Sequence, residues 1–268
     1  MVGFTSISKC DILKIMKGII FDLDGVLINS APDMAASINK TLENFGFATV
    51  DANIIPSFIG NGARVFLVRS LATSLGYENA GLIGEVVSND NKKMEIQNLP
   101  ADFPISLEKI DEMLKWYISY YKEHSVENTV LYPNVISVLE SCKNKNIPLG
   151  VVSNKPAAIS RRILSLFQIN AYFDAVIGPE DTGKTKPAPD GLALAAKIMC
   201  EKSGQEIPHS EILMVGDSYY DIWAGKNFGC LTCGILGGYG KISKDDKAKP
   251  SADFYLDYVG DLVEVCLG

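Results

Sequence analysis

Two aspartates one residue apart are the first feature of this sequence that could do chemistry. Asp22 and Asp24 lie in the stretch Phe21-Asp-Leu-Asp-Gly25, directly after the apolar residues 18–20. Carboxylates this close repel each other, so both can be ionised comfortably only if a cation lies near them. A carboxylate supported in this way can attack phosphorus, while its neighbour moves protons.

Four more polar side chains follow apolar strands that we predict later in the chain. They supply a hydroxyl, an ammonium group and two carboxylates, in chain order from Ser153, Lys186, Asp217 and Asp221. In an open parallel sheet, ligands bind where the carboxyl ends of the strands meet. We therefore expect these four side chains to lie beside Asp22 and Asp24 at one edge of a sheet.

Clustered carboxylates with no nearby His or Cys favour a hard cation as their partner. The candidate ligands are Asp22, Asp24, Asp217 and Asp221. Oxygen ligands suit Mg²⁺, which can also polarise a phosphoryl oxygen. Asp22 is then the predicted nucleophile and Asp24 the predicted acid and base. Ser153 and Lys186 would support the charge on the transferring group.

Each motif has a more ordinary interpretation when it is taken alone. The paired aspartates could belong to a calcium loop, although the glycine comes fourth rather than sixth and Asp33 stands where such loops carry Glu. Ser153-Asn154 could cap a helix, and Lys186-Pro187 could form a solvated turn. The order of all the motifs along one chain favours a catalytic site.

The secondary structure that must position these residues is predicted to change along the chain, from mainly helices to alternating strands and helices. After a strand at 18–22, apolar residues recur at helical spacing, so we read residues 31 to about 124 as almost wholly helical, with a mixed helix and loop segment at 77–104. Strands then alternate with helices, which predicts a parallel sheet covered on both faces. We expect its later strands at 147–152, 173–177, 212–215 and 231–235. The predicted fold is α/β, a Rossmann-like parallel sheet with a helical insertion after its first strand.

Composition limits the class of protein. A chain of 268 residues that is 47% hydrophobic can bury the core of one large domain or two modest ones. A net charge of −7 argues against a nucleic-acid surface. We find no apolar stretch long enough to span a bilayer and no secretory signal. We expect a cytoplasmic monomer or homodimer that handles a small molecule and binds neither nucleic acid nor membrane.

The motifs, taken in order, resemble those of the haloacid dehalogenase-like hydrolase superfamily. The resemblance implies that Asp22 is phosphorylated during the reaction and that Asp24 is the acid and base. It also implies that Mg²⁺ is held by the Asp22 side chain, the Asp24 backbone carbonyl and Asp217. Asp221 completes the acidic motif, Ser153 matches the second motif, and Lys186 is the lysine of the family.

The same resemblance implies how the chain is divided. The family inserts a helical domain, the cap, between its first two motifs. We place the cap at residues 30–125 and the core at 16–29 and 126–268, with an extension at 1–15.

Further stretches are similar to the bacterial phosphoglycolate phosphatases of that superfamily, among them Ile59-Gly-Asn-Gly-Ala63 and Val152-Ser-Asn-Lys-Pro156. This resemblance implies an Mg²⁺-dependent phosphoric monoester hydrolase that releases glycolate and phosphate. The predicted substrate-binding residues are Gly60, Asn61, Gly62, Arg64 and Asn154. Free N–H groups of the glycine loop, together with Arg64, could receive the substrate carboxylate. A plain glycine turn beside a solvated arginine explains the same residues.

Other functions stay open at this point. The substrate could be another small ester, such as a nucleoside monophosphate or a sugar phosphate. The chain could also be a sugar phosphomutase, or a binding module without turnover. Asp24 favours ester hydrolysis, because dehalogenases of the superfamily lack a second aspartate. Met34 stands where the mutases carry a histidine, and all four motif carboxylates are present.

Overall fold

A six-stranded parallel sheet forms the centre of the computed structural model, which describes residues 16–84, 99–240 and 242–263. The predicted extension at 1–15 and part of the segment at 77–104 lie outside these ranges. In spatial order the strands are β5 (Ala175–Ile177), β4 (Leu149–Val152), β1 (Gly18–Phe21), β6 (Ile212–Gly216), β7 (Leu231–Ile235) and β8 (Phe254–Leu256). The predicted α/β class is confirmed, and β8 is an additional strand that was not predicted.

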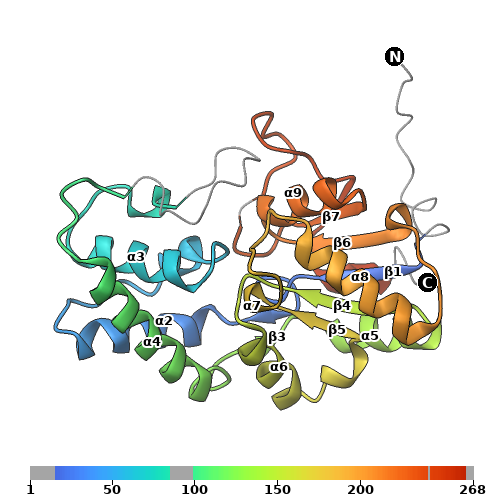
Figure 1. Ribbon diagram of the computed structural model, residues 1–268, viewed down its shortest axis with the longest axis horizontal. Coiled ribbons are helices and arrows are strands. Elements are labelled where there is room, and N and C mark those ends of the chain that lie inside the picture. The colour runs from blue at the N-terminus through green and yellow to red at the C-terminus, as the bar shows by residue number, and fades with distance from the viewer. Residues whose placement is uncertain (1–15, 85–98, 241, 264–268) are drawn as a thin grey trace.

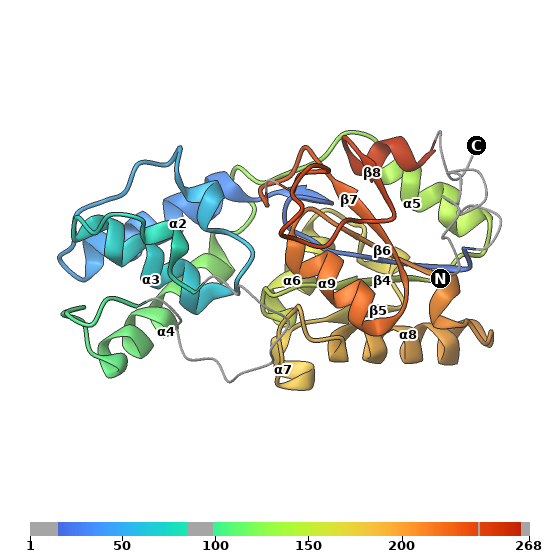
Figure 2. The same ribbon diagram turned by 90° about the horizontal axis from the view of Figure 1, so that it is seen from above.

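Helices cover both faces of the sheet, as predicted. Ile19 and Phe21 of β1 belong to the core on one face and Ile20 to the core on the other. The first face packs against α5 (Val135–Asn144) and α6 (Ala157–Leu166), and the second against α8 (Asp190–Ser203) and α9 (Tyr219–Phe228). Figure 2 shows α5 and α8 on opposite sides of the strands. A strand buried on both faces reads as a continuous apolar run, which is why β1 could be recognised in the sequence.

The register brings the motif residues to one edge of the sheet. Phe21, the last residue of β1, pairs with Val151 of β4 and with Val215 of β6. The residues that follow these three strands therefore leave the sheet side by side. Two predicted strands begin later than expected, at Leu149 and Ala175. Proline has no N–H to donate to a neighbouring strand, which explains why β4 starts only after Pro148.

The cap contains three long helices that lie to one side of the sheet (Figure 1). They are α2 (Ala31–Asn44), α3 (Ala63–Ser74) and α4 (Leu107–Glu123). The expectation of almost wholly helical structure is wrong between α2 and α3, where only a short 3-10 helix (Ile55–Phe58) forms. Glycines with positive φ at 46, 60 and 62 break the helical pattern there. Within the described ranges, no helix combines the length and the apolar character that crossing a bilayer requires.

Two chain segments join the cap to the core. The first, β2 (Ile28–Asn29), leads into α2, and the second, β3 (Val130–Leu131), returns from α4. The two pair antiparallel as a separate short sheet. Strands of two residues carry too little pattern to be read from a sequence. The cap boundaries at 30 and 125 stay a prediction.

Asp33, in the first turn of α2, ties the start of this helix to the residues directly before β3. Its carboxylate is 1% exposed and accepts hydrogen bonds of 2.7–3.0 Å from the backbone N–H groups of Glu127, Asn128 and Thr129 and from the Thr129 hydroxyl. Burial alone would raise the pKa of Asp33, but the hydrogen bonds from Thr129 and Asn128 bring it below its usual value. The charged form of this residue therefore stabilises the folded protein.

Replacing Asp33 by asparagine should lower the free energy of unfolding by about 2–3 kcal/mol at neutral pH, because buried N–H donors would face an amide. The pKa in the folded state is depressed, so the stabilisation is full above the unfolded-state value of about 3.9 and is lost as the pH falls through the folded-state value. Wild type and variant should therefore converge in acid. Urea unfolding measured over a series of pH values tests this.

Asp51→Asn is the matched control, since the Asp51 side chain is exposed and accepts only local hydrogen bonds. Its effect should stay within about 0.5 kcal/mol. Equal losses for the two variants, or a loss for Asp33→Asn that does not change with pH, would contradict the assigned role of Asp33.

Candidate active site

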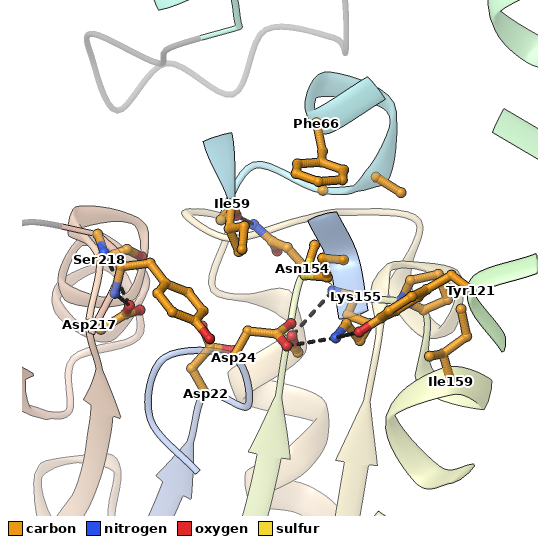
Figure 3. Close-up of a pocket in the computed structure, with 18 of the residues that line it drawn as sticks. Asp22, Asp24, Ile59, Phe66, Tyr121, Asn154, Lys155, Ile159, Asp217 and Ser218 are labelled. Atoms are coloured by element: carbon orange, nitrogen blue, oxygen red, sulfur yellow. Dashed lines mark hydrogen bonds and ion pairs between the residues drawn. The ribbon is translucent and has the colours of Figure 1, made fainter. Parts of the chain in front are cut away.

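Three buried carboxylates meet at the edge of the sheet that the sequence predicted. Asp22 follows β1, Asp217 follows β6, and Asp221 lies in the first turn of α9. They are 8%, 4% and 0% exposed, and each offers an oxygen within 4.8 Å of the others. Figure 3 shows Asp22 and Asp217 at the floor of a cavity, below Phe66 of the cap.

Lys186 is the cation of this cluster. Its ammonium group donates to Asp221 Oδ1 at 2.6 Å, to Asp22 Oδ1 at 3.0 Å and to the Val152 carbonyl at 2.8 Å, so all three of its N–H groups are used. Burial lowers the pKa of Lys186, but the carboxylates of Asp22 and Asp221 outweigh this and hold it above its usual value. Lys186 therefore stays charged beside the predicted nucleophile.

One lysine does not balance three carboxylates, and the uncompensated negative charge contributes to raised pKa values of Asp22 and Asp217. Burial, together with the neighbouring Asp221 and Asp24, raises the pKa of Asp22 to about 7, although Lys186 opposes the shift. Burial and the charges of Asp221 and Asp22 raise the pKa of Asp217 well above its usual value. A divalent cation would remove this excess, and an all-oxygen donor set suits Mg²⁺. The residues present therefore fit such an ion.

The three carboxylates are not equivalent as ligands. Asp221 uses Oδ1 for Lys186 and Oδ2 for the Ser218 backbone N–H and hydroxyl, at 3.0 and 2.6 Å. Its oxygens are thus engaged in orienting Lys186 and in capping α9. Asp22 and Asp217 are the better candidates to hold an ion, with Asp221 placed beside them as a source of negative charge.

The absence of a side chain at Gly25 leaves room for the Asp217 carboxylate. Gly25 has a φ of +81°, and a Cβ atom there would overlap the Asp217 carboxylate. The same carboxylate accepts N–H groups of Tyr239 and Gly240, at 2.5 and 3.1 Å, from the loop after β7. The first motif and this loop therefore hold Asp217 from both sides.

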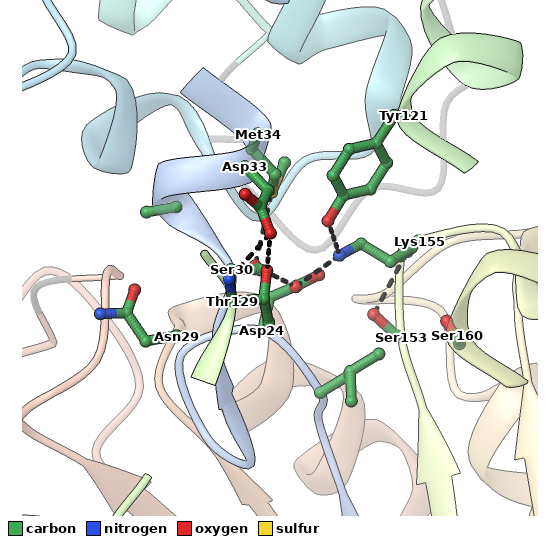
Figure 4. Close-up of polar contacts among 12 residues, drawn as sticks. Asp24, Asn29, Ser30, Asp33, Met34, Tyr121, Thr129, Ser153, Lys155 and Ser160 are labelled. Atoms are coloured by element: carbon green, nitrogen blue, oxygen red, sulfur yellow. Dashed lines mark hydrogen bonds and ion pairs between the residues drawn. The ribbon is translucent and has the colours of Figure 1, made fainter. Parts of the chain in front are cut away.

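Asp24 lies close to Asp22 in sequence but has different partners. Its Oδ1 accepts the Ser30 hydroxyl at 2.5 Å and the Lys155 ammonium at 2.6 Å, and the Lys155 ammonium also donates to the Tyr121 hydroxyl at 2.8 Å. Figure 4 shows this chain of contacts running from Asp24 to Tyr121 of the cap. The carboxylate of Asp24 lies outside the group of three that could hold an ion. Coordination through its backbone carbonyl stays a prediction.

A cavity joins these groups to the cap. Its polar floor includes Asp22, Asp24, Ser153 and Asp217 from the core. Its cap wall is apolar and aromatic and includes Met34, Ile59, Phe66, Tyr117, Ile118 and Tyr121. A small molecule bound there would have its charged end on the floor and the rest of its surface under the cap.

The predicted glycine loop of the cap reaches the core. Gly60 and Gly62 line the cavity, and Gly62 is the N-cap of α3. The Asn61 amide donates to the Tyr220 hydroxyl at 2.5 Å, so it ties the loop to α9. Arg64 pairs with Asp111 of α4 and is not among the residues that line the cavity. The structure therefore leaves Arg64 outside the cavity lining, although the sequence suggested that this side chain receives the substrate carboxylate.

Asn154 lines the cavity, but its amide is engaged with the backbone. Its Nδ2 donates to the carbonyls of Gly60 and Lys186, at 2.9 and 3.2 Å, and its Oδ1 accepts the Lys186 N–H at 2.8 Å. These bonds hold the loop of Lys186 and the glycine loop of the cap against β4. Substrate binding by Asn154 stays a prediction, beside this positioning role.

Sequence reasoning gave no function to Lys155, Ser30 or Tyr121. Lys155 stands directly after Ser153-Asn154 in a motif that was recognised, so its position was available as a signal. Ser30 and Tyr121 reach the site from either end of the cap, and the folded structure is what shows their contacts with Asp24 and Lys155. The loop at 237–240 follows β7 at the same edge of the sheet, and its Tyr239 and Gly240 line the cavity.

Comparison with known proteins places the chain in a family. The model of the haloacid dehalogenase-like hydrolase family matches residues 19–235. The phosphoglycolate phosphatase of Escherichia coli strain K12 is 34% identical over 248 residues, which are 92% of this chain and 91% of that protein. The phosphoglycolate phosphatase of Salmonella typhimurium is 34% identical over 229 residues, with 85% and 84% coverage.

Solved structures agree with the fold. One described as a predicted phosphoglycolate phosphatase from Haemophilus somnus is 28% identical, with a TM-score of 0.73, and the match covers 94% of this chain and 98% of that one. A structure from Lactobacillus delbrueckii has a TM-score of 0.77 at 24% identity, with the same coverage of both chains. The second likeness concerns the fold alone.

Replacing Asp217 by asparagine should weaken Mg²⁺ binding by about tenfold or more, because it removes a charged oxygen ligand at the point where α9 and the loop after β7 converge. Calorimetric titration of the protein with Mg²⁺, without any substrate, measures this. Asp245→Asn, which changes an exposed carboxylate in the loop after β7, is the matched control and should leave the affinity unchanged. Equal affinity in Asp217→Asn and wild type would remove Asp217 from the ion site.

Proposed function

The chain belongs to the haloacid dehalogenase-like hydrolase family, and on that premise we propose that it hydrolyses phosphoglycolate to glycolate and phosphate through a phosphorylated aspartate. The coarser function, a phosphoric monoester hydrolase, follows from the family and from the curated relatives. The substrate, the dependence on Mg²⁺ and the covalent intermediate are the further content of the proposal.

The observation that carries the proposal is the separation of the two aspartates. Asp22 lies among buried charges that fit a cation, in contact with Lys186. Asp24 turns toward the cavity and the cap. A covalent phosphatase needs one carboxylate that bonds to phosphorus and another that transfers protons near the leaving oxygen. The two positions suit these two tasks.

In the first step an Asp22 carboxylate oxygen bonds to phosphorus as the bond between phosphorus and the ester oxygen breaks. Asp24 gives its proton to the departing oxygen, so glycolate leaves as an alcohol. In the second step Asp24 takes a proton from water while that water attacks the phosphorus. The bond between phosphorus and Asp22 then breaks, phosphate leaves, and both aspartates return to their starting states.

The surrounding residues prepare these steps. Lys186 neutralises Asp22, so that an anionic ester can approach it, and its positive charge stabilises the phosphoryl group during transfer. Ser153 is 5% exposed and offers a hydroxyl on the cavity floor for the same group. Asp22 and Asp217 would hold Mg²⁺, which when bound would supply a Lewis acid to polarise the phosphoryl group. The cap wall excludes bulk water from the bond that breaks.

The size of the substrate is supported by the relatives and by the cavity. Both named curated relatives are phosphoglycolate phosphatases and are matched over most of their length. The cavity is narrowed by aromatic side chains of the cap, among them Phe66 and Tyr117, which contact each other with ring centroids 5.8 Å apart. A small ester is the kind of ligand that suits a site with such a wall.

In an assay of phosphate release from a panel of monoesters, kcat/KM should be highest for phosphoglycolate. Release should stop when a chelator removes Mg²⁺. The panel should include a nucleoside monophosphate and hexose phosphates, assayed with and without added Mg²⁺. Preference for a different ester would overturn the substrate and keep the chemistry. Isomerisation of a hexose phosphate without release would favour a mutase, and no reaction with any ester would contradict the proposal.

Substitutions of the two aspartates should impair different steps of the reaction. Asp22→Asn should lower the rate by at least about a thousandfold and form no phosphoprotein. Asp24→Asn should lose about 10²–10⁴-fold with phosphoglycolate, but with an activated ester such as nitrophenyl phosphate it should accumulate phosphorylated Asp22. Quenched-flow mass spectrometry of the intact protein distinguishes these results. A phosphoprotein in Asp22→Asn would refute the choice of nucleophile.

A further inference from the structure

Lys155 differs from the other lysine of the site in one respect. Both are buried, with side chains 5% and 3% exposed. Lys186 uses three N–H groups on three acceptors. Lys155 has two acceptors among the described residues, Asp24 Oδ1 at 2.6 Å and the Tyr121 hydroxyl at 2.8 Å. An ammonium group has three N–H donors, so Lys155 keeps one for a further acceptor.

The remaining donor lies at the cavity rather than in the protein interior. Lys155 is one of the lining residues, and of the described residues that line the cavity it is the only cationic one. Figure 3 shows its ammonium group between Asp24 and Tyr121, at the junction of floor and cap wall. A buried charged donor without its full set of acceptors is costly, so a ligand that supplies one is favoured there.

We propose that Lys155 binds the non-reacting anionic group of the substrate and so selects phosphate esters that carry a carboxylate close to the ester oxygen. This inference rests on the proposed function and names the residue that sets its specificity. Lys155 takes the part that the sequence suggested for Arg64, which the structure instead pairs with Asp111 outside the cavity lining.

The position of Asp24 limits how far that carboxylate can be from phosphorus. Asp24 must reach the ester oxygen to protonate it, and Lys155 is hydrogen-bonded to the same Asp24 carboxylate. A substrate whose ester oxygen lies at Asp24 and whose carboxylate accepts the free N–H of Lys155 must therefore have a short chain between these two groups. In phosphoglycolate a single methylene carbon separates the ester oxygen from the carboxylate, which meets this condition.

The rest of the wall supports the same assignment. Phe66, Tyr117 and Ile118 present mainly apolar surface, against which an uncompensated carboxylate would be strongly disfavoured. Tyr121 has its hydroxyl on Lys155 and its ring within 4.9 Å of the same ammonium group. The cap thereby fixes the direction of the lysine, and its apolar residues strengthen the attraction between that lysine and an anion.

Lys155 could alternatively serve only to hold Asp24, and binding of unreactive analogues separates the two roles. Phosphonopropionate carries the carboxylate of phosphoglycolate on a phosphonate that cannot be hydrolysed, and propylphosphonate lacks the carboxylate. Calorimetry with Mg²⁺ present should show tighter binding of phosphonopropionate by wild type. Lys155→Met should weaken the binding of phosphonopropionate by roughly 30- to 100-fold, as expected for a lost charged hydrogen bond. The same variant should weaken the binding of propylphosphonate by less than about threefold.

Two further variants sharpen the comparison. Lys155→Arg keeps a cation and should retain most of the preference for phosphonopropionate. Lys197→Met changes an exposed lysine on α8 and should behave as wild type. Equal weakening of both phosphonates in Lys155→Met would show that the lysine acts only through Asp24 and would overturn the inference.

Failure of this inference can be told apart from failure of the proposed function. Wild type that releases phosphate from phosphoglycolate, yet binds the two phosphonates equally, overturns the role of Lys155 alone. Wild type that prefers phosphonopropionate through Lys155, yet releases no phosphate from any ester, supports the anion site and overturns the proposed hydrolysis.

Discussion

The structure depends on gathering four carboxylates, and the negative charge that they can carry, in a place that water barely reaches. Asp22, Asp24, Asp217 and Asp221 are each at most 8% exposed at one edge of the sheet. Two buried lysines compensate part of this charge, Lys186 on the core side and Lys155 toward the cap. The charge left among Asp22, Asp217 and Asp221 is what makes a divalent cation fit, and it is reflected in the raised pKa of Asp22 and Asp217. The fold, with strands ending side by side, is what makes such crowding possible.

The cap contributes residues to the site at this charged edge of the sheet. Asp33 ties the start of α2 to the residues directly before β3, while Asn154 and Asn61 fasten the glycine loop of the cap to the core. Tyr121 then places its hydroxyl on Lys155. The cap therefore contributes to the polar network of the site as well as covering it, and this allows cap position, acid–base residue and substrate recognition to be linked through few contacts.

The sequence was most informative where chemistry and secondary structure coincide. Asp22, Ser153 and Asp217 each follow an apolar strand, and the rule that such strands end at a common edge placed them correctly. Two-residue strands such as β2 and β3 lack any usable periodicity, so the connection between cap and core could not be predicted. Side-chain direction was equally inaccessible. Arg64 directly follows one recognised stretch and Lys155 stands in another, but only packing decides that the first meets Asp111 and the second faces the cavity.

The central claim is that Asp22 attacks phosphorus and that water attacks it in a second displacement. The stereochemical course at phosphorus tests this most directly, using a phosphate ester made chiral with oxygen isotopes and hydrolysed in isotopically labelled water. Two successive in-line displacements, each with inversion, predict phosphate with net retention of configuration. Net inversion would mean that water attacks the ester in a single step, and would contradict the account.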